Sequence, residues 1–293
     1  MNAVRRSYSL TNRMKIVKKI KELQTLIERE KKKGEAIGLV PTMGYLHSGH
    51  ISLIKKGKKD SDLVVVSIYV NPTQFGESED YKRYPRDLER DSKLAKAAGT
   101  DILFVPSNKE IYPDGYCTFI RVEELSEKLC GISRPIHFRG VVTIVAKLFN
   151  IIKPDKAYFG WKDAQQLIII KKMVKDLNID VEVVGLPTVR ERDGLAVSSR
   201  NEYLSKEERK IAPVLYQALV KAKRMVDLGE NNSAKVLKEA EDIIIKAKKV
   251  KIDYLKAVSL TDLKDVKKIE KNTLIAVAAW IGKTRLIDNM LIK

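Results

Sequence analysis

Residues 36–50 decide the fold, and they read AIGLVPTMGYLHSGH. The run from Ala36 to Val40 is apolar, as in a strand that is buried on both faces of a parallel sheet. A Pro-Thr-Met-Gly turn follows it, and we expect a helix from His50 to Lys59. A second apolar and β-branched run, Asp62 to Val70, completes a strand–helix–strand unit. The stretch therefore predicts an α/β protein with a parallel sheet.

The same alternation continues on both sides of this unit. Upstream, Lys15 to Lys33 has the charge pattern of a solvated helix. Downstream, we expect helices at Asp87 to Ala98, Val141 to Ile152 and Ala164 to Leu177, and strands at Ile102 to Val105, Ala157 to Phe159 and Val181 to Val184. With right-handed crossovers, this order gives a Rossmann-like, doubly wound parallel sheet, whose ligands bind beyond the carboxyl ends of the strands.

After Pro187 the pattern changes. A hairpin-like stretch containing glycine leads into two long helices, Lys206 to Leu228 and Ala234 to Lys248, and then into two alternating segments, Lys251 to Val258 and Leu274 to Ile281. This order predicts a second, smaller α+β domain. We therefore divide the chain into an N-terminal extension (1–13), a Rossmann-like domain (14–187) and a smaller C-terminal domain (188–293).

Charge is the most unusual feature of the composition. The 293 residues include 56 Lys and Arg against 38 Asp and Glu, which gives a formal net charge of +18. Such a charge attracts nucleic acids and small anions alike. Basic and acidic residues are interleaved along the expected helices, and no recognised nucleic-acid motif accompanies them. We therefore expect anionic small molecules as ligands and no nucleic acid, and steeply salt-dependent binding to DNA or RNA would contradict this.

Cysteine content and hydropathy indicate the compartment. Only Cys117 and Cys130 are present, and their spacing matches neither a metal site nor a redox motif. This favours a reducing environment, the cytoplasm. No apolar stretch near the start is long enough for a signal peptide, and no later run is long enough to span a bilayer. We expect neither secretion nor membrane insertion.

Two of the three histidines mark the first candidate site. His47 and His50 are three residues apart at the expected helix start, so their rings lie on one face, and Gly44 and Gly49 let backbone approach a ligand. A helix N-terminus offers free N–H groups to phosphate. Imidazole donors there can stabilise charge that builds up during transfer at an α-phosphate. The alternative is that both histidines are caps or surface residues.

A second candidate site follows the expected strand at 62–70. There the sequence reads Asn71-Pro72-Thr73-Gln74-Phe75-Gly76, which places two neutral amides at the carboxyl end of a strand. Such amides can orient a carboxylate or hydroxyl group. The alternative is a plain turn, because Asn-Pro and Phe-Gly are ordinary loop sequences.

A third candidate site is the segment Gly160-Trp161-Lys162-Asp163, which opens another helix. Lys162 supplies a point charge for phosphate. Asp163 either caps the helix or contacts the nucleotide, and the two alternatives stay open. Gln166 faces the cleft if Lys162 does.

The fourth candidate site is the polar segment from Asp193 to Asn201. Its hydroxyls and the guanidinium of Arg200 predict a mobile loop that closes over the β- and γ-phosphates and excludes water. The alternative is a surface loop followed by a helix cap. His137, the remaining histidine, is either a further ligand contact or part of a turn before a buried helix, and we favour the turn.

Together the motifs resemble the pantoate–β-alanine ligase family from about residue 14 to residue 293. The matching segments are 41–44, 47–50, 71–76, 84–86, 137–140, 162–163, 194–201 and 284–289. The resemblance implies that ATP adenylates the carboxylate of pantoate and that pyrophosphate leaves. The amine of β-alanine then attacks pantoyl-adenylate to give pantothenate, a precursor of coenzyme A, and AMP. Mg²⁺ with ATP, a homodimer, and a C-terminal lid over an ATP- and pantoate-binding domain are implied as well.

Site residues also follow from the resemblance. It implies ATP contacts for Met43, Gly44, Tyr45, Leu46, His47, Ser48, Gly49, His50, Gly160, Trp161, Lys162, Asp163, Val189, Val197, Ser198, Ser199 and Arg200. Gln74 and Gln166 would bind pantoate, and Gln74 and Asn71 would bind β-alanine. His50 would be the proton-donating catalytic residue, joined in catalysis by His47, Lys162 and Arg200.

Three positions depart from the pattern of the family. Trp161 stands where Glu or Gln is usual, Ala164 where an aromatic residue is common, and Val197 where Met or Leu is usual. None of them removes a catalytic group. Trp161 is the most unusual, because an indole beside the ATP loop could change packing or nucleotide affinity.

A simpler nucleotidyltransferase is the main alternative, because that superfamily shares the His-x-Gly-His signature. Such an enzyme would stop after transfer to a phosphate acceptor, and the amides after residue 70 and the long second domain favour the ligase. For Mg²⁺, no ligand set stands out, and Asp91 is the one residue we single out, since Mg²⁺ takes most of its ligands from phosphates and water. No residue is assigned as the base that deprotonates β-alanine.

Overall fold

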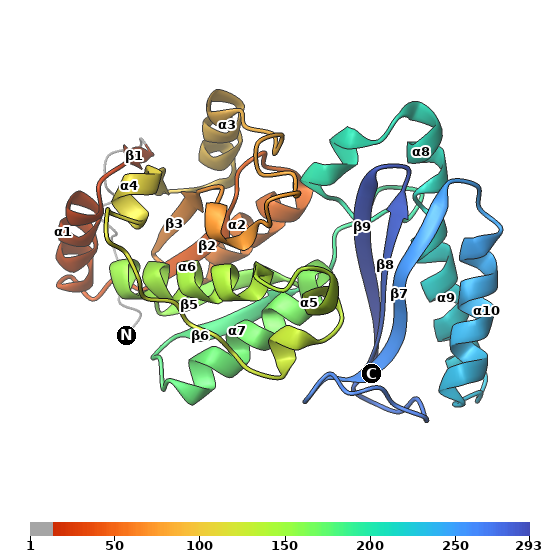
Figure 1. Ribbon diagram of the computed structural model, residues 1–293. Helices are drawn as coiled ribbons and strands as arrows, with labels where there is room; N and C mark the ends of the chain where they lie inside the picture. Colours follow the sequence, from red (N-terminus) through yellow and green to blue (C-terminus); the bar gives the residue numbers. More distant parts are fainter. Residues whose placement is uncertain (1–13) are drawn as a thin grey trace, which may run out of the picture.

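The computed structural model describes residues 14–293, and the predicted extension at 1–13 lies outside the described residues. Within this part of the chain, two sheets form side by side (Figure 1). The larger sheet is parallel, with the order β1-β4-β3-β2-β5-β6. Its strands are β1 (Lys15–Val17), β2 (Ile37–Thr42), β3 (Leu63–Ile68), β4 (Ile102–Phe104), β5 (Lys156–Gly160) and β6 (Glu182–Leu186).

Helices cover both faces of the parallel sheet. Its long helices are α1 (Ile20–Lys31), α2 (Ser48–Asp60), α3 (Leu88–Ala98), α6 (His137–Ile152) and α7 (Ala164–Asp176). Side chains of α1, α6 and α7 pack with Leu39 and Val65 on one face, whereas α2 and α3 pack with Val40 and Val66 on the other. Because neighbouring residues in a strand point to opposite faces, both faces of β2 and β3 must be apolar. The prediction of a doubly wound parallel sheet is confirmed.

Short helical turns occupy several loops of the same part. They are α4 (Asn108–Ile111), α5 (Cys130–Ser133) and the 3-10 turns η1 (Pro72–Gln74), η2 (Leu125–Glu127) and η3 (Trp161–Asp163). η1 and η3 directly follow the carboxyl-end regions of β3 and β5. These two turns therefore lie on the side of the sheet where ligands of doubly wound sheets bind.

The start of the described chain differs from the prediction of a helix from Lys15. Residues Lys15–Val17 form β1, which pairs in parallel with β4, and α1 begins only at Ile20. Val17 is buried in the core, and β-branched Ile16 and Val17 suit a strand better than a helix. The pairing with a strand far along the chain decides the structure here.

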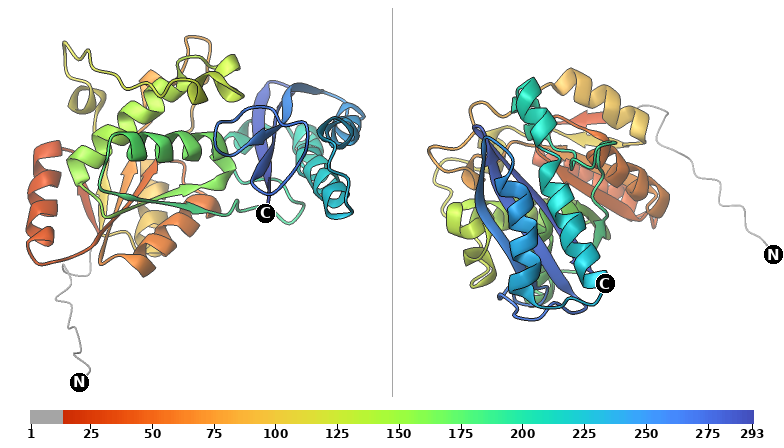
Figure 2. Two further views of the ribbon diagram at one scale, coloured as in Figure 1. Left: turned by 90° about the horizontal axis from the view of Figure 1, so that it is seen from below. Right: turned by 90° about the vertical axis from the view of Figure 1, so that its right-hand side faces the viewer.

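The C-terminal part contains an antiparallel sheet, β7 (Val250–Ser259), β8 (Thr273–Ile281) and β9 (Thr284–Ile292). Helices α9 (Val214–Asp227) and α10 (Ser233–Ile245) cover its outer face, as Figure 2 shows. The predicted helix 206–228 is interrupted: α8 (Lys206–Ile211) ends before Pro213, which lacks the N–H that a continuous helix needs. β9 was not predicted as a strand. The smaller α+β unit is confirmed as an element of the fold, and its boundary near residue 188 stays a prediction.

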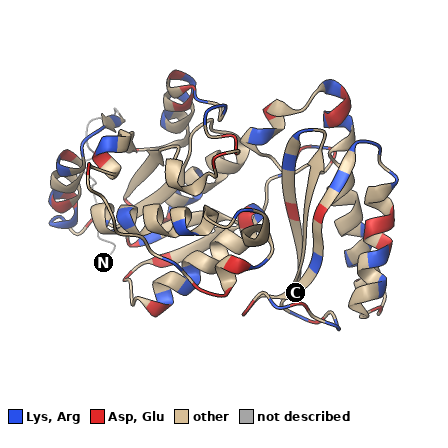
Figure 3. Ribbon diagram, in the orientation of Figure 1, with Lys and Arg blue, Asp and Glu red and all other residues tan. Residues whose placement is uncertain are grey.

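Charged groups are spread over the molecule, with Lys and Arg close to Asp and Glu on most helices (Figure 3). Pairs such as Lys172–Asp176, Lys223–Asp227 and Lys238–Asp242 are one helical turn apart. This is the arrangement expected of solvated helix faces. No helix formed by residues 14–293 combines the length and apolar character needed to cross a bilayer.

Candidate active site

A cavity of about 980 Å³ lies between the two sheets, at the carboxyl ends of the parallel strands. This size is at the upper end of the range typical of ligand sites. All four predicted segments contribute to its walls. The predicted residues that line it are Met43, His47, Gly49, His50, Asn71, Gln74, Gly160, Lys162, Asp163, Gln166, Val189, Val197, Ser198, Ser199 and Arg200. The structure therefore brings together motifs that are more than 150 residues apart in the sequence.

The turn between β2 and α2 is shaped by one buried carboxylate. Gly44 and Tyr45 have positive φ angles of 85° and 49°. Asp91 accepts hydrogen bonds from the backbone N–H groups of Tyr45 (2.6 Å) and Leu46 (2.7 Å) and is 1% exposed. Gly44, Tyr45 and Leu46 thus form the frame of the turn, while Ser48 is exposed at the start of α2.

Asp91 does not suit the role of Mg²⁺ ligand that we considered for it. Both of its oxygens already accept backbone hydrogen bonds, and the residue borders a separate hollow of about 250 Å³ behind the turn. Burial raises the pKa of Asp91, although the bonds from Leu46 and Tyr45 act against this. Among residues 14–293, no group of three or more His, Cys, Asp or Glu side chains is arranged to hold a metal ion. The sequence could not show that this carboxylate is used by the backbone.

His47 and His50 lie stacked at the wall of the cavity, with ring centroids 3.9 Å apart. The backbone N–H of His47 lies 3.4 Å from Nδ1 of His50, a long hydrogen bond that favours the tautomer with its proton on Nε2. Burial, followed by the charge of Lys162, lowers the pKa of His47 to about 4. Burial and the neighbouring His47 lower the pKa of His50 well below its usual value. Both rings are therefore neutral near pH 7.

Neutral imidazoles still carry one N–H each, and here they have room for a ligand. Nδ1 of His47 is buried and has no hydrogen-bond partner among residues 14–293. This nitrogen lies beside Gly49 in the first turn of α2, where His47 is the N-cap residue and the ring of His50 accepts a hydrogen bond from the backbone N–H of His47. The two histidines therefore cap the helix and line the cavity at the same time. Together with the backbone N–H groups at the start of α2, the two uncharged rings can donate hydrogen bonds to phosphate oxygens.

The amide of Asn71 orients other groups. Its Nδ2 donates to Oε1 of Gln74 (3.2 Å) and to the carbonyl of Gly140 (3.0 Å), and its Oδ1 accepts from the hydroxyl of Tyr112 (2.9 Å). Asn71 is fully buried. Gln74 also borders the cavity, beside Met43, with Nε2 2.9 Å from the Met43 sulfur. The structure thus gives Asn71 a positioning role, and its contact with β-alanine stays a prediction.

His137 belongs to this region, and the interpretation as a preceding turn was wrong. It is the first residue of α6, lines the cavity, and its Nδ1 lies 2.9 Å from the carbonyl oxygen of Gln74. Burial, then Arg134, lowers the pKa of His137 well below its usual value. Arg134 in turn forms hydrogen bonds to Glu79 and the Gln74 carbonyl. The only sequence signal was the motif at 137–140.

The turn η3 holds Lys162 at the cavity. Its ammonium lies 3.5 Å from the carboxylate of Asp163, and both side chains face the cavity. Asp163 precedes α7, yet its carboxylate makes no capping hydrogen bond within the described chain. The capping alternative is therefore wrong for this structure, and a carboxylate remains available in the cavity.

Trp161 does not crowd the cavity. Its indole packs against Gly185 in β6, where an added Cβ would come within 2.8 Å of the indole nitrogen. It also joins the hydrophobic core beside Leu167. Ala164 and Val197, the other two departures, are buried side chains in the cavity wall. A glycine at 185 therefore accommodates the indole outside the ligand space.

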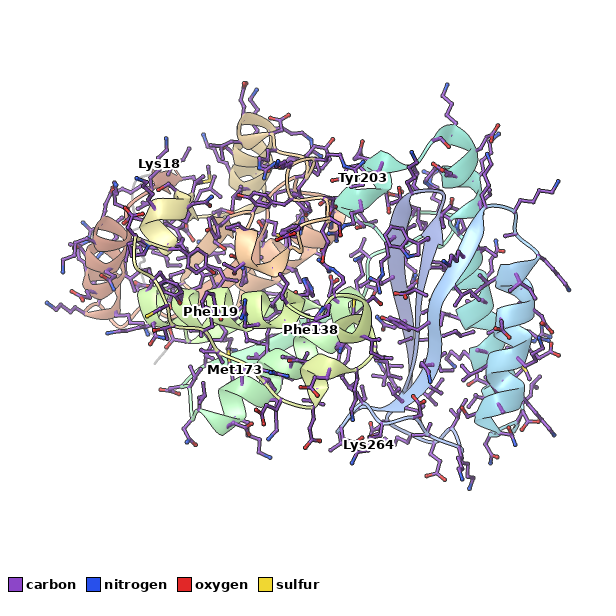
Figure 4. All side chains as sticks on the ribbon, in the orientation of Figure 1. Lys18, Phe119, Phe138, Met173, Tyr203 and Lys264 are labelled. Atoms are coloured by element: carbon purple, nitrogen blue, oxygen red, sulfur yellow. The ribbon has the colours of Figure 1, made fainter. Side chains whose placement is uncertain are left out.

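The segment that carries Arg200 is a 3-10 turn, η4 (Ser199–Tyr203), that contacts the parallel-sheet part. Nε and Nη2 of Arg200 each lie 2.9 Å from an oxygen of Asp80. Burial would raise the pKa of Asp80, but its hydrogen bonds and charge interaction with Arg200 outweigh this and lower it. Ser199 donates to the carbonyl of Tyr45, and Tyr203, labelled in Figure 4, donates to the carbonyl of Arg83. The sequence did not indicate Asp80 as a partner.

Comparison with known proteins agrees with this geometry. The family model described as "Pantoate-beta-alanine ligase" matches residues 15–291. The chain belongs to the pantoate–β-alanine ligase family. Pantothenate synthetase from Caldicellulosiruptor saccharolyticus is 54% identical over 280 residues, which cover 96% of this chain and all of that protein. The one from Acetivibrio thermocellus has the same identity and coverage.

Solved structures of the pantoate–β-alanine ligase family have the same fold. Pantothenate synthetase from Thermus thermophilus superposes with a TM-score of 0.91 at 46% identity, covering 95% of this chain and 99% of that one. The pantoate–β-alanine ligase from Francisella tularensis, "Complexed with Beta-gamma ATP and Beta-alanine", gives a TM-score of 0.79 at 39% identity, with 95% and 98% covered. The family resemblance noted from the motifs is confirmed.

Proposed function

We propose that the cavity between the two sheets is the active site of an ATP-dependent carbon–nitrogen ligase. The chain condenses pantoate with β-alanine to form pantothenate, through pantoyl-adenylate, with release of pyrophosphate and AMP. The observation that carries the proposal is the meeting of phosphate-binding groups (His47, His50 and Lys162) with a neutral amide (Gln74) in one cavity. This pairing supplies a site for a nucleotide beside a site for a small hydroxy acid.

In the first step, the pantoate carboxylate attacks the α-phosphorus of ATP and pyrophosphate leaves. Negative charge then builds on the phosphate oxygens, and preorganised donors stabilise it without reorganising. We assign this role to the neutral N–H groups of His50 and His47 and to the ammonium of Lys162. Because burial keeps both imidazoles neutral, they act as hydrogen-bond donors in the free enzyme and not as charged acids.

In the second step, the amine of β-alanine attacks the acyl carbon of pantoyl-adenylate and AMP leaves. Gln74 and Gln166, which both border the cavity, would hold pantoate, and Gln74 would also contact β-alanine. Asn71 would act through Gln74, because its own amide is engaged by protein groups. The proposed lid at Ser198, Ser199 and Arg200 would keep water from the reactive intermediate.

The proposed ATP contacts fall into two groups. Met43, His47, Gly49, His50, Gly160, Lys162, Asp163, Val189, Val197, Ser198, Ser199 and Arg200 line the cavity and would touch the nucleotide. Gly44, Tyr45, Leu46 and Ser48 would contribute through the shape of the turn and the start of α2, and Trp161 through the backbone of η3.

Magnesium is proposed as a partner of the nucleotide. The residues present fit a metal that arrives with ATP, because Mg²⁺ keeps most of its ligands from phosphates and water. Asp163, a cavity carboxylate without a capping role, would accept a hydrogen bond from such a water. Bound Mg²⁺ would neutralise charge on the triphosphate. We further propose a homodimer located in the cytoplasm, as the family resemblance implies, and light scattering of the purified chain tests the dimer.

A three-substrate assay tests the function and separates it from a simpler nucleotidyltransferase. With pantoate, β-alanine and Mg-ATP, the chain should form AMP, pyrophosphate and pantothenate in equal amounts. Omitting β-alanine should allow at most slow pyrophosphate release and no pantothenate. Failure to form AMP with all substrates present, or equal AMP formation without β-alanine, would contradict the ligase. Retention on immobilised DNA at two salt concentrations checks the nucleic-acid alternative.

A further inference from the structure

Strand β9 connects the two loops that are proposed to hold the phosphates. It contacts both η3, which carries Lys162, and η4, which carries Arg200. Two adjacent residues of this strand, Asp288 and Asn289, are 4% and 9% exposed. Since successive side chains of a strand point to opposite faces, the pair reaches in two directions from one piece of backbone.

Asn289 binds the Lys162 loop. Its Nδ2 donates to the carbonyl oxygens of Trp161 (2.8 Å) and Lys162 (3.0 Å), so both protons of the amide are used. These bonds join the C-terminal sheet to a loop of the parallel sheet. Asp163 does not cap the following helix, so Asn289 supplies side-chain hydrogen bonds that fix the backbone on which the Lys162 ammonium depends.

Asp288 binds the segment that leads to Arg200. Its two oxygens accept hydrogen bonds from Arg190 at 2.6 and 2.9 Å. Arg190 also donates to the carbonyl of Gly194 (3.0 Å), lies over the ring of Tyr216, and pairs with Ala196 in an antiparallel bridge. Asp288 thereby anchors the hairpin-like stretch immediately before Ser198.

We infer that Asn289 is a positioning residue for Lys162. With Asp288 anchoring the opposite segment, adjacent residues of β9 set the separation between Lys162 and the Ser198–Arg200 turn. A rigid strand holding both loops keeps the phosphate-binding groups in register with each other, which matters because small displacements at a reacting phosphate cost rate. The inference rests on the proposed function, since it assigns Asn289 to the adenylation step.

Asn289→Asp is the decisive variant. It has the same size, but a carboxylate cannot donate to the two carbonyls. With ATP, pantoate and β-alanine present, pyrophosphate release should become roughly 10- to 100-fold slower, while the KM for pantoate should change much less. A purely structural role would lower the thermal midpoint without this split between kcat and KM. If Asn289→Asp does not fold, Asn289→Ala, which adds no charge beside the carbonyls, replaces it.

A double variant tests whether Asn289 acts through Lys162. The chain with Asn289→Asp and Lys162→Ala should be no slower than Lys162→Ala alone, because residues that act as a unit are not additive. Lys128→Met is the matched control: its ammonium donates to the carbonyl of Asp262 (3.1 Å), a bond between the two parts of the fold outside the cavity. Its turnover should stay within about twofold of wild type.

The possible failures are distinguishable. If the wild-type chain releases no pyrophosphate and forms no AMP with ATP, pantoate and β-alanine present, the proposed function is wrong. If the wild type is active but Asn289→Asp behaves like Lys128→Met, or if its loss adds fully to that of Lys162→Ala, only the positioning role is overturned. Non-additive loss with a nearly unchanged pantoate KM supports it.

Discussion

The two sides of the cavity are held in different ways. On the parallel-sheet side, the turn from Met43 to His50 is fixed by backbone hydrogen bonds to one buried carboxylate, Asp91. On the C-terminal side, η4 is held by side chains: the ion pair between Arg200 and Asp80 and the hydrogen bonds that Ser199 and Tyr203 donate to backbone carbonyls. A buried carboxylate with two backbone donors is costly to disturb, whereas an ion pair at a cavity can exchange one anion for another. The comparison contrasts a rigid wall, fixed through its backbone, with a wall held through side chains, which we propose to move as a lid.

Replacing a reactive group of the rigid wall should have the largest effect. We expect His50→Ala to lower turnover by roughly 10- to 1,000-fold, because a preorganised donor at a developing charge is lost. The measurement is steady-state pyrophosphate release at saturating ATP. Lys55→Ala, an exposed substitution on the same helix, is the control and should be nearly silent. Turnover of His50→Ala near that of wild type would remove His50 from the mechanism.

Removing the support of the rigid wall should affect stability and activity together. Asp91→Ala leaves a buried and a part-buried backbone N–H group without an acceptor, so we expect a loss of about 2–4 kcal/mol in the free energy of unfolding. Urea unfolding measures it, and ATP-dependent turnover should fall in the same variant. Glu89→Gln on the same helix removes only an exposed pair with Lys93 and should change stability little. Equal stability of the two variants would contradict the framing role of Asp91.

Breaking the ion pair of the wall that we propose to move should mainly affect nucleotide binding. Arg200→Ala removes the guanidinium that pairs with Asp80 at the cavity, and we expect the KM for ATP to rise by about tenfold, the value of one charged hydrogen bond. Arg209→Ala, which removes a more exposed pair with Asp193, serves as control. If ATP affinity and rate both stay unchanged in Arg200→Ala, the lid assignment fails.

Lowering the pH should reduce the free energy of unfolding through the buried histidines before it affects the ion pair of Asp80. The folded pKa of His47 is lowered to about 4, and those of His50 and His137 are lowered as well, so below pH 6.5 the unfolded chain binds protons that the folded chain does not. Stability is therefore fully present above pH 6.5 and falls as the pH falls from there. Asp80, whose folded pKa is lowered, loses its contribution only below its unfolded value near 3.8.

Urea unfolding from pH 7.5 to pH 4.5 tests this, because a loss above pH 4.5 reports the histidines rather than Asp80. His47→Gln should flatten the pH dependence in this window by removing one of the three groups. A dependence that is unchanged in His47→Gln would show that His47 is not neutral in the folded chain.

The alternation of apolar runs and helices was enough to predict the parallel sheet. β1 was missed because three residues carry too little periodicity, and only their pairing with β4 makes them a strand. The prediction of one helix at 206–228 ignored Pro213, although a proline inside a helical pattern by itself favours a break. β9 was missed because polar residues interrupt both of its faces, Arg285 and Asn289 on one and Asp288 on the other, and they bind partners elsewhere in the fold.

For the site, the four motifs at strand ends were found because each is local in the sequence. The groups that hold them were not, since their partners are distant: Asp91 binds backbone 46 residues away, and Asp80 binds Arg200 at a separation of 120. His137 is the same kind of case, 63 residues from the carbonyl of Gln74 that it contacts. The residues with a chemical role could thus be predicted from local motifs, whereas the residues that position them could be identified only from the tertiary structure.

The place of Trp161 has a practical consequence. The chain has two tryptophans, and one of them belongs to the loop that carries Lys162 while its indole rests on Gly185. Indole fluorescence responds to the polarity and quenching groups around the ring. With Trp280→Phe, the remaining emission would come from Trp161 alone. The enzyme would then carry a built-in optical reporter of its nucleotide loop, and stopped-flow mixing with ATP could follow that loop without any attached label.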